Sequence, residues 1–417
     1  MERFETAKAV LLGISIPMAA FGPAPLAVTL GLAVLLVLRD FIREKRYLDL
    51  AEAARAPLGL SLLLLLGWCL LGALFSSEKT FSLITLLRTA LSVLLCHVIF
   101  QQLRDKQAFF NLAVKTLLVS SAIVIGYIFI VQYLYPEALE IYAQFRSSDT
   151  KVRWAFKAFS SVAACLIPIF LWFSITKQGY WRICALILLP LAIAIIWRNG
   201  INTSRSALFG LAGSIVFLAL CFILQHFSKR RFYVIFTGIL ITVSLFSAWL
   251  LSAMPHYPFD GMALVDIALP FPDPHRQVIW ARTAEIIMDH PFMGIGLNTI
   301  NLLPQAQETV TLKFAPGMVK TIEFIPSHPH NWILEIAVEA GLVGLAITFA
   351  CFTILIGNLL HAIRVGQNTA WVPLGLIGVF SISSMTNFSI WTSWWQAIFF
   401  VLLALCLAAV YHHQETN

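Results

Sequence analysis

The feature that most constrains this chain is a succession of apolar runs, each about as long as one membrane crossing. A helix that spans the hydrocarbon core of a bilayer needs roughly 20 mostly apolar residues. Only 12% of the residues are charged, whereas 59% are hydrophobic. A soluble domain carries roughly 25% charged residues. This chain therefore lacks the polar coat that water requires, and the bilayer is the solvent in which it folds.

The apolar runs predict an all-α polytopic membrane protein with about twelve transmembrane helices. The expected spans are 8–21, 25–41, 57–75, 80–101, 109–135, 159–176, 182–198, 206–226, 232–253, 331–360, 370–390 and 393–411. A long polar segment, 254–330, separates residues 1–253, which hold the earlier spans with short loops, from residues 331–417. The last part holds the remaining spans and a short cytoplasmic tail.

The distribution of basic residues predicts the orientation, because Lys and Arg favour the cytoplasmic side of short loops. With the N-terminus inside, the inner segments hold Arg3, Lys8, Arg39, Arg43, Lys45, Arg46, Arg55, Arg104, Lys106, Lys177, Arg182, Lys229, Arg230, Arg231 and Arg364. An even number of spans places the C-terminus inside as well. We therefore expect a multi-pass protein of the bacterial inner membrane, with both termini cytoplasmic and 254–330 periplasmic.

Several cations nevertheless fall on the expected outer side, against this bias. They are Arg146, Lys151, Arg153, Lys157, Arg205, Arg276, Arg282, Lys313 and Lys320. Long loops translocate regardless of charge, which explains Lys313 and Lys320 as well as a function would. That explanation is weaker for Arg205, which lies in a short loop beside a membrane boundary.

The net charge of +7 does not indicate a nucleic-acid partner, because the basic residues separate apolar runs and do not cluster on one soluble element. All seven cysteines fall inside the apolar runs and form no C-x-x-C pair, so neither zinc nor a disulfide framework is indicated. The sequence also lacks HExxH, P-loop and GxSxG motifs. We expect neither a metal nor a cofactor.

The segment 254–330 is rich in proline, but His275–His290 contains neither proline nor glycine. Arg276, Trp280, Thr283 and Ile287 follow a helical spacing there, which predicts one stripe of an amphipathic helix. Such a helix, with its Trp and its cation, suits the level of the lipid headgroups.

The strongest local signal is Ser327-His328-Pro329-His330-Asn331-Trp332, just before the tenth expected span. Ser327 is expected to cap that helix, with Pro329 in its first turn. A helix N-terminus disfavours protonation of a nearby histidine. A neutral imidazole can accept a proton, as a general base must. The alternative is that His328 and His330 are interfacial residues that merely end a loop.

Glu335 and Glu339 follow on one face of the same expected helix, where a carboxylate costs about 2.5–3.5 kcal/mol on insertion scales. Such groups usually face the bundle interior, paired with a buried Arg or a Ser/Thr hydroxyl. Arg88, within the fourth expected span, pairs with one of these acids or meets a substrate anion.

Thr203-Ser204-Arg205-Ser206 opens the eighth expected span from the outside. The guanidinium fork of Arg205 suits bidentate phosphate binding, and backbone N–H groups at a helix start add to it. Arg276 is a second candidate, and Arg146, Lys151 and Arg153 are alternatives. Singly, each could simply meet lipid headgroups. Together they imply an anion at the outer surface.

These motifs resemble those of the O-antigen ligase family, within a superfamily that also holds O-antigen polymerases and pilin O-oligosaccharyltransferases. His330-Asn331 followed after nine residues by Gly341-x-x-Gly344 matches the H-[NSQ]-x9-G-x-x-G signature. The run from Asp289 to Asn298, the Thr203–Arg205 run and the Arg276/Trp280 pair are similar to other landmarks of the superfamily.

The resemblance implies a GT-C-type membrane glycosyltransferase fold with a large periplasmic loop. The activity it implies is transfer of polysaccharide from undecaprenyl diphosphate to lipid A–core, in lipopolysaccharide biosynthesis, without metal. His330 would be the catalytic base, and Arg205, Arg276 and Arg88 would bind the diphosphate. His328, Asn331 and Trp280 would support them. A polymerase or a pilin transferase could use the same motifs. A transporter also has about twelve spans, but its substrate site would lie near the membrane midplane and its halves would repeat.

Overall fold

The computed structural model describes residues 3–141, 156–202, 204–252, 264–265, 274–315 and 318–414. Within these residues, ten helices are long and apolar enough to cross a membrane. They are α2 (Pro23–Arg43), α4 (Pro57–Phe75), α5 (Lys79–Asp105), α6 (Gln107–Phe129) with its π-helical extension η2 (Ile130–Leu134), α8 (Lys157–Thr176), α9 (Gly179–Asn202), α10 (Ser206–Leu224), α11 (Lys229–Ser252), α15 (Gly341–Arg364) and α17 (Ser393–Gln414). The chain is a polytopic helical membrane protein.

The other two expected spans are shorter helices. The first, α1 (Arg3–Ser15), ends before the 3-10 turn η1 (Pro17–Phe21), and α16 (Trp371–Ser383) follows the turn η5 (Asn368–Ala370). Each has 13 residues, which reach only about 20 Å at 1.5 Å per residue. The expected number of about twelve full-length spans is therefore ten by length.

The tenth expected span, 331–360, is not one continuous helix. It divides into α14 (Trp332–Glu339) and α15, with the break at Ala340 and Gly341. Gly341 has a φ of 73°, and a Cβ there would lie 2.0 Å from the carbonyl oxygen of Phe292. The helix breaks because the chain near Phe292 packs directly against this point.

A small cap that the all-helical expectation missed lies between α11 and α14. The helix expected here is present as α12 (Pro274–Asp289), followed by η4 (Ile300–Leu302) and α13 (Pro304–Gln307). Strand β1 (Leu264–Val265) pairs in parallel with β2 (Thr309–Ala315), which pairs antiparallel with β3 (Met318–Glu323). Val310 and Leu312 of β2 are buried, and their alternation with threonine and lysine is the period of a half-buried strand.

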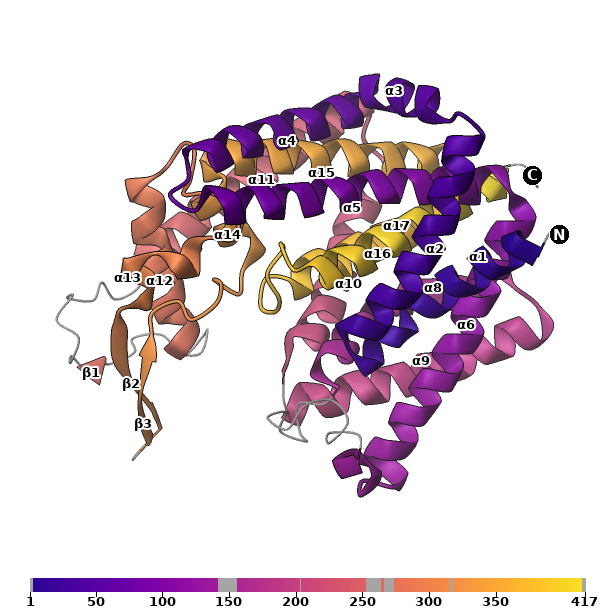
Figure 1. Cartoon of the computed structure of the whole chain (residues 1–417), viewed down its shortest axis with the longest axis horizontal. Helices are drawn as coiled ribbons and strands as arrows, with labels where there is room; N and C mark the ends of the chain where they lie inside the picture. Colours follow the sequence, from indigo (N-terminus) through magenta and orange to yellow (C-terminus); the bar gives the residue numbers. More distant parts are fainter. Residues whose placement is uncertain are drawn as a thin grey trace.

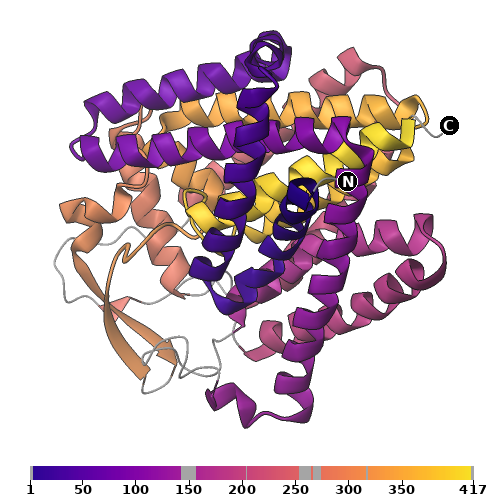
Figure 2. The ribbon, with the colours of Figure 1, turned by 45° about the vertical axis from the view of Figure 1, so that its right-hand side comes forward.

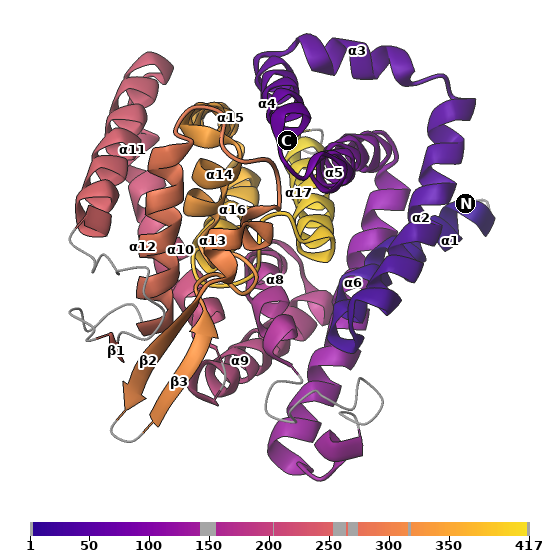
Figure 3. The same ribbon diagram turned by 60° about the vertical axis from the view of Figure 1, so that its left-hand side comes forward.

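The cap lies at one end of the helices and both chain termini lie at the other (Figure 1). Figure 2 brings the end with the termini forward and again shows them away from β2 and β3. In Figure 3, helices α4 and α5 lie on one side of α14–α16 and α11 lies on the other, while α3 (Tyr47–Arg55) runs across from α2 to α4.

Two buried apolar clusters hold this arrangement together. The larger is formed by the long helices, with Trp395, Phe159 and Phe170 among its fully buried members. The smaller joins the cap to α14 through residues such as Ile279 and Trp332. The histidines of the sequence motif lie where the cap meets the long helices.

Candidate functional site

The loop between α16 and α17 organises the site. Its Asn387 is buried, and the side-chain Nδ2 donates to Ser161 Oγ of α8 over 2.7 Å. The backbone carbonyl of Asn387 accepts hydrogen bonds from His328 Nε2 (2.9 Å) and His330 Nδ1 (2.8 Å). One anchored carbonyl therefore holds both histidines of the motif.

This carbonyl fixes the protonation pattern of His330. A carbonyl oxygen can only accept, so Nδ1 of His330 carries the proton and Nε2 of the neutral ring keeps its lone pair. Among the described residues, no hydrogen bond is made to that Nε2. The rings of His328 and His330 lie 4.1 Å apart, tilted by 60°. The arrangement presents one imidazole lone pair for proton transfer.

His330 precedes helix α14 and does not belong to its first turn. The expected cap, Ser327, is wrong: Asn331 is the N-cap, and its side chain accepts from the backbone N–H of Ile333 (3.1 Å) and of Leu334 (3.4 Å). His330 itself has a φ of 52°. A non-glycine residue with this backbone is uncommon and is concentrated at functional sites.

The surroundings of His330 favour its neutral form. The pKa of His330 is lowered to about 3, mainly by burial and further by the neighbouring His328, Arg276 and Lys157, while the bond to Asn387 opposes them. Burial also lowers the pKa of His328. The sequence predicted a neutral imidazole from the helix N-terminus, but the larger cause is loss of water.

Of the two arginine candidates, Arg276 bonds to the same loop and Arg205 lies next to a residue that does. The carbonyl of Thr386 accepts from the Arg276 guanidinium over 3.0 Å and from Ser206 Oγ over 2.8 Å. Arg205, next to Ser206, is exposed at the N-cap of α10. Trp280 Nε1 donates to the carbonyl of Pro329 over 2.9 Å. Helix α12 thus binds the histidine segment through Trp280 and the α16–α17 loop through Arg276.

Lys157, at the start of α8, is a cation of the site that the sequence indicated only as an outer charge. Its charge acts on His328, on His330 and on Arg276, so it lies close to all three. The sequence feature that could have identified Lys157 as a site residue is its position at the expected outer start of a span. The other anion candidates, Arg146, Lys151 and Arg153, and also Thr203, lie outside the described residues.

Arg88 makes no hydrogen bond to the histidine loop among the described residues. Its guanidinium donates to Thr85 of its own helix over 3.1 Å, and the residue is exposed. It forms no ion pair in the part of the chain that the structure describes, so the expected pairing with Glu335 or Glu339 is wrong. The alternative, contact with a substrate anion, stays a prediction.

Glu335 and Glu339 are buried and bonded: Glu335 to the hydroxyl of Ser389 and to a backbone N–H group, and Glu339 to N–H groups. Neither forms an ion pair with an arginine among the described residues. Oε1 of Glu339 accepts from the backbone of Thr299 (3.0 Å) and Ile300 (3.2 Å), and Oε2 accepts from the backbone of Asn298 (2.6 Å) and from the indole of Trp391. Oε2 of Glu335 accepts from the backbone of Ile390 (2.9 Å). These carboxylates tie the cap and the α16–α17 loop to α14.

The glycines of the run from Asp289 to Asn298 allow two backbone segments to pack directly against each other. Gly294 has a φ of 71°, and a Cβ there would lie 2.5 Å from the carbonyl of Glu339. The N–H groups of Ile295 and Gly296 donate to the carbonyls of Val338 and Glu339, both over 3.0 Å. The segment after His290 therefore passes through the α14–α15 break, where side chains would not fit. These glycines position the site and do not take part in its chemistry.

Arg282 has a structural role, because it is buried and paired with Glu285 (2.8 Å) and Glu308 (2.9 Å). Within the described ranges, no group of three His, Cys, Asp or Glu residues is placed to hold a metal ion. The site that the structure assembles therefore consists of imidazoles, cations and N–H donors.

Comparison with known proteins relates part of the chain to one family. Residues 200–349 match the family model described as O-antigen ligase. The chain carries an O-antigen ligase domain. A protein of Rickettsia prowazekii named as a polysaccharide ligase is 28% identical over 208 residues, which is 49% of this chain and 47% of that protein. A similarly named protein of Rickettsia bellii is 25% identical over 345 residues, which is 80% of this chain and 76% of that protein. The match thus spans about half the length of the first relative.

The O-antigen ligase domain contains Arg205, Arg276, Trp280 and the histidine–glycine signature. It does not reach the loop that binds them, since Asn387 and the anchoring Ser161 both lie outside residues 200–349. The site is therefore completed by helices before and after the matched segment.

Proposed function

We propose that this protein is a glycosyltransferase that moves a polysaccharide from undecaprenyl diphosphate onto lipid A–core at the periplasmic face of the bacterial inner membrane. The observation that carries the proposal is His330, kept neutral mainly by burial, with Nδ1 bonded to the carbonyl of Asn387 and Nε2 available, beside the cations Arg276 and Lys157. The proposal includes the GT-C-type architecture and requires neither metal nor cofactor.

In the proposed reaction, Nε2 of His330 takes the proton from the acceptor sugar hydroxyl. The oxygen attacks the anomeric carbon of the donor, a C–O bond forms, and the bond to the diphosphate breaks with inversion. The electron pair leaves on the diphosphate, near Arg276 and Arg205, with Arg88 as a third contact. Fixed cations placed where charge develops stabilise such a transition state.

The low pKa of His330 gives a prediction for pH dependence. A lowered pKa keeps the imidazole neutral, so the acidic limb of kcat/KM, which reports the free enzyme, should lie well below pH 6.5. A bound diphosphate would offset Arg276 and Lys157 and raise the pKa, which makes His330 a better base. The acidic limb of kcat should therefore lie above that of kcat/KM. Initial rates from pH 4.5 to 8 locate the kcat limb and show whether the kcat/KM limb lies below this range. A kcat/KM limb at 6.5 or higher would contradict this environment for the base.

Arg276→Lys tests the arginine fork. Lysine keeps the charge but cannot bind Thr386 and a phosphate together with the same planar group. We expect kcat/KM to fall about tenfold or more, since a charged hydrogen bond contributes about 1.5–3 kcal/mol. Arg282→Lys, in the buried ion pairs, is the control for lost stability, and unchanged kinetics in Arg276→Lys would argue against the fork.

The proposed function is tested by in-vitro transfer. Purified protein is mixed with undecaprenyl-diphosphate-linked glycan and lipid A–core in the presence of a chelator, and the mass of the acceptor is followed. A mass shift that requires His330 supports the ligase. Donor consumed into longer chains or onto a protein would favour the polymerase or the pilin transferase. Untouched donor with every acceptor would favour a transporter.

A further inference from the structure

Helix α3 connects two membrane-spanning helices without crossing the membrane itself. It follows α2 and precedes α4, and it lies at the end of α4 that is away from the cap (Figure 1). Its nine residues reach only about 14 Å at 1.5 Å per residue, whereas the hydrocarbon core is about 30 Å thick. None of the nine is buried. Because both of its neighbours cross the membrane, α3 lies at a membrane surface.

The direction of α3 is fixed at both ends. Its N-cap residue, Arg46, pairs with Asp105 at the end of α5 and with Glu44 over 2.7 Å. At the other end, the carbonyl of Ala53 packs against Gly59 of α4, where a Cβ would lie 2.1 Å away. Helix α3 is therefore a fixed part of the fold that runs across from α2 to α4 (Figure 3), and not a free linker.

Two faces of α3 have an evident environment. Leu50, Ala53 and Ala54 follow the i, i+3, i+4 spacing of one helix face and are half-buried, and Leu50 packs against the larger apolar cluster. Asp49 and Glu52, which are i, i+3 neighbours, share a second face and are exposed. The first face is turned toward the protein and the second toward water.

The third face has the composition of a helix at the membrane interface. It holds Tyr47, Ala51 and Arg55 at i, i+4, i+8, with Leu48 beside them, and all of them are exposed. The exposed fraction is 57% for Tyr47 and 70% for Leu48. Interfacial helices place aromatic residues and leucines at the acyl boundary, and their arginines keep the charge at the headgroups. Since the protein and water account for the other two faces, this face is the one available to the membrane.

The cations around α3 are of two kinds. Arg46 is neutralised by its ion pairs. Arg43, Lys45 and Arg55 are exposed, and none of them forms an ion pair among the residues that the structure describes. Each Lys or Arg near an anionic membrane surface raises the affinity roughly fivefold. These residues flank the apolar face at both ends of α3 and therefore favour anionic phospholipids over neutral ones.

We propose that α3 lies in the headgroup layer of the cytoplasmic leaflet and binds anionic phospholipids there. Tyr47 and Leu48 lie at the acyl boundary, and Arg43, Lys45 and Arg55 bind the lipid phosphates. The choice of leaflet rests on the orientation in the proposed function, whereas the lipid contact does not depend on glycosyl transfer. A membrane is favoured over a protein partner because the helices on both sides of α3 already place it at the bilayer.

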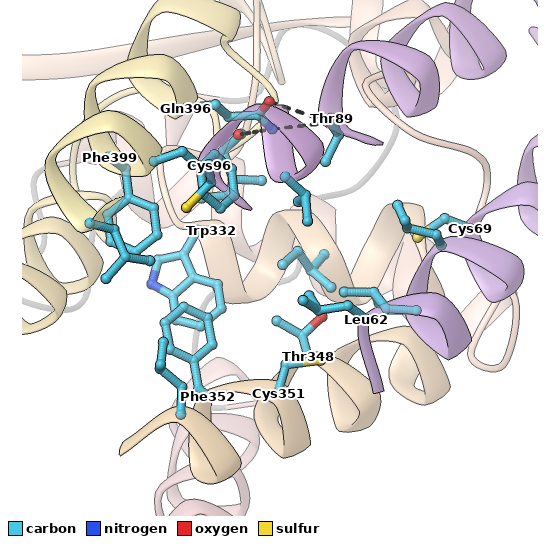
Figure 4. Close-up of a pocket in the computed structure, with 18 of the residues that line it drawn as sticks. Leu62, Cys69, Thr89, Cys96, Trp332, Thr348, Cys351, Phe352, Gln396 and Phe399 are labelled. Carbon is cyan, nitrogen blue, oxygen red and sulfur yellow. Dashed lines mark hydrogen bonds between the residues drawn. The ribbon is translucent and has the colours of Figure 1, made fainter. Parts of the chain in front are cut away.

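The membrane contact is tested in the full chain with Leu48→Cys and Glu52→Cys, each carrying a bimane label. None of the native cysteines is exposed; Cys69, Cys96 and Cys351 line an apolar cavity among the helices (Figure 4), and the parent protein treated with the label gives the background. The protein is placed in nanodiscs of phosphatidylcholine that carries a quenching nitroxide on the acyl chain near the headgroup. The label at Leu48 should be quenched on the order of fivefold more than the label at Glu52, because only the first lies at membrane depth. Equal quenching would overturn the proposal, since that face would then be open to water or to a partner protein.

The preference for anionic lipid is tested with the same label at Leu48. Nitroxide-labelled phosphatidylglycerol should quench it roughly fivefold more than nitroxide-labelled phosphatidylcholine at the same mole fraction. Arg43→Gln with Arg55→Gln should remove this preference. Arg230→Gln with Arg231→Gln, which removes the same charge from exposed residues at the start of α11, should preserve it. Equal quenching by the two lipids in the parent, or equal loss in both double variants, would contradict anionic lipid binding by α3.

These measurements separate the role of α3 from the reaction. If no transfer occurs with any acceptor, but the label at Leu48 shows both effects, the lipid contact stands and the proposed function fails. If transfer occurs, but the label at Leu48 is quenched no more than the label at Glu52, the proposed function stands and the role of α3 is overturned.

Discussion

His330→Asn should reduce transfer by about 10²–10⁴-fold, the usual contribution of a general base, while the protein still folds and inserts. Asparagine tolerates the φ of 52° at this position better than alanine does, so the variant removes the imidazole with little strain on the backbone. The measurement is the rate of glycan transfer at saturating donor and acceptor. The melting temperature, measured in parallel, should change little.

His328→Asn is the matched control, because His328 binds the same Asn387 carbonyl through Nε2 and not Nδ1. Loss of the His328 imidazole should lower the transfer rate by less than loss of His330 does, because it only loosens the packing around the His330 ring. The roles would have to be exchanged if His328→Asn abolished transfer and His330→Asn retained it. Near-normal rates in both variants would remove general-base catalysis by histidine from the proposal.

The histidine pair was predictable because its functional groups are side chains, which the sequence specifies directly. Two imidazoles before an apolar run, with arginines on the same expected side of the membrane, predict a polar site at one end of the helices. The spacing of α12 was likewise readable, since Arg276 and Trp280 lie one helical turn apart. The structure brings both to the segment around His330.

The loop that organises the site was not predictable in the same way. The sequence places it between two apolar runs, and its contribution comes from the backbone carbonyls of Thr386 and Asn387. Every residue has a carbonyl, so composition and spacing carry no signal for such a contact. The end of α16 was misplaced: the expected span ran from 370 to 390, but the helix ends at Ser383, before the polar residues Ser384, Thr386 and Asn387.

The glutamates show how burial changes the interpretation of a charged residue. From the sequence, Glu339 was expected to pair with a buried arginine, such as Arg88, or with a Ser/Thr hydroxyl. The structure gives it four N–H donors, from three consecutive backbone amides and the indole of Trp391. A carboxylate with this many donors has a structural role: it holds the segment from Asn298 to Ile300 in place.

Glu339→Ala should therefore lower the stability of the protein, whereas the rate of transfer by the molecules that remain folded should change little. Each buried N–H group left without an acceptor costs about 1–3 kcal/mol. Loss of four such bonds should lower the melting temperature by on the order of 10 °C. Thermal unfolding of the detergent-solubilised protein, followed by accessibility of its buried cysteines, measures this effect. Transfer should fall in proportion to the fraction that remains folded.

Glu339→Gln separates the structural role from a catalytic one. Glutamine keeps one oxygen, which can still accept from Thr299 and Ile300, but its amide group would face two donors, Asn298 N–H and the Trp391 indole. Its stability should lie between those of the wild type and the alanine variant, and so should its activity. A melting temperature equal to that of the wild type, together with complete loss of transfer, would show instead that the carboxylate acts in the reaction. The folded-state hydrogen bonds favour the first outcome because they already use both oxygens.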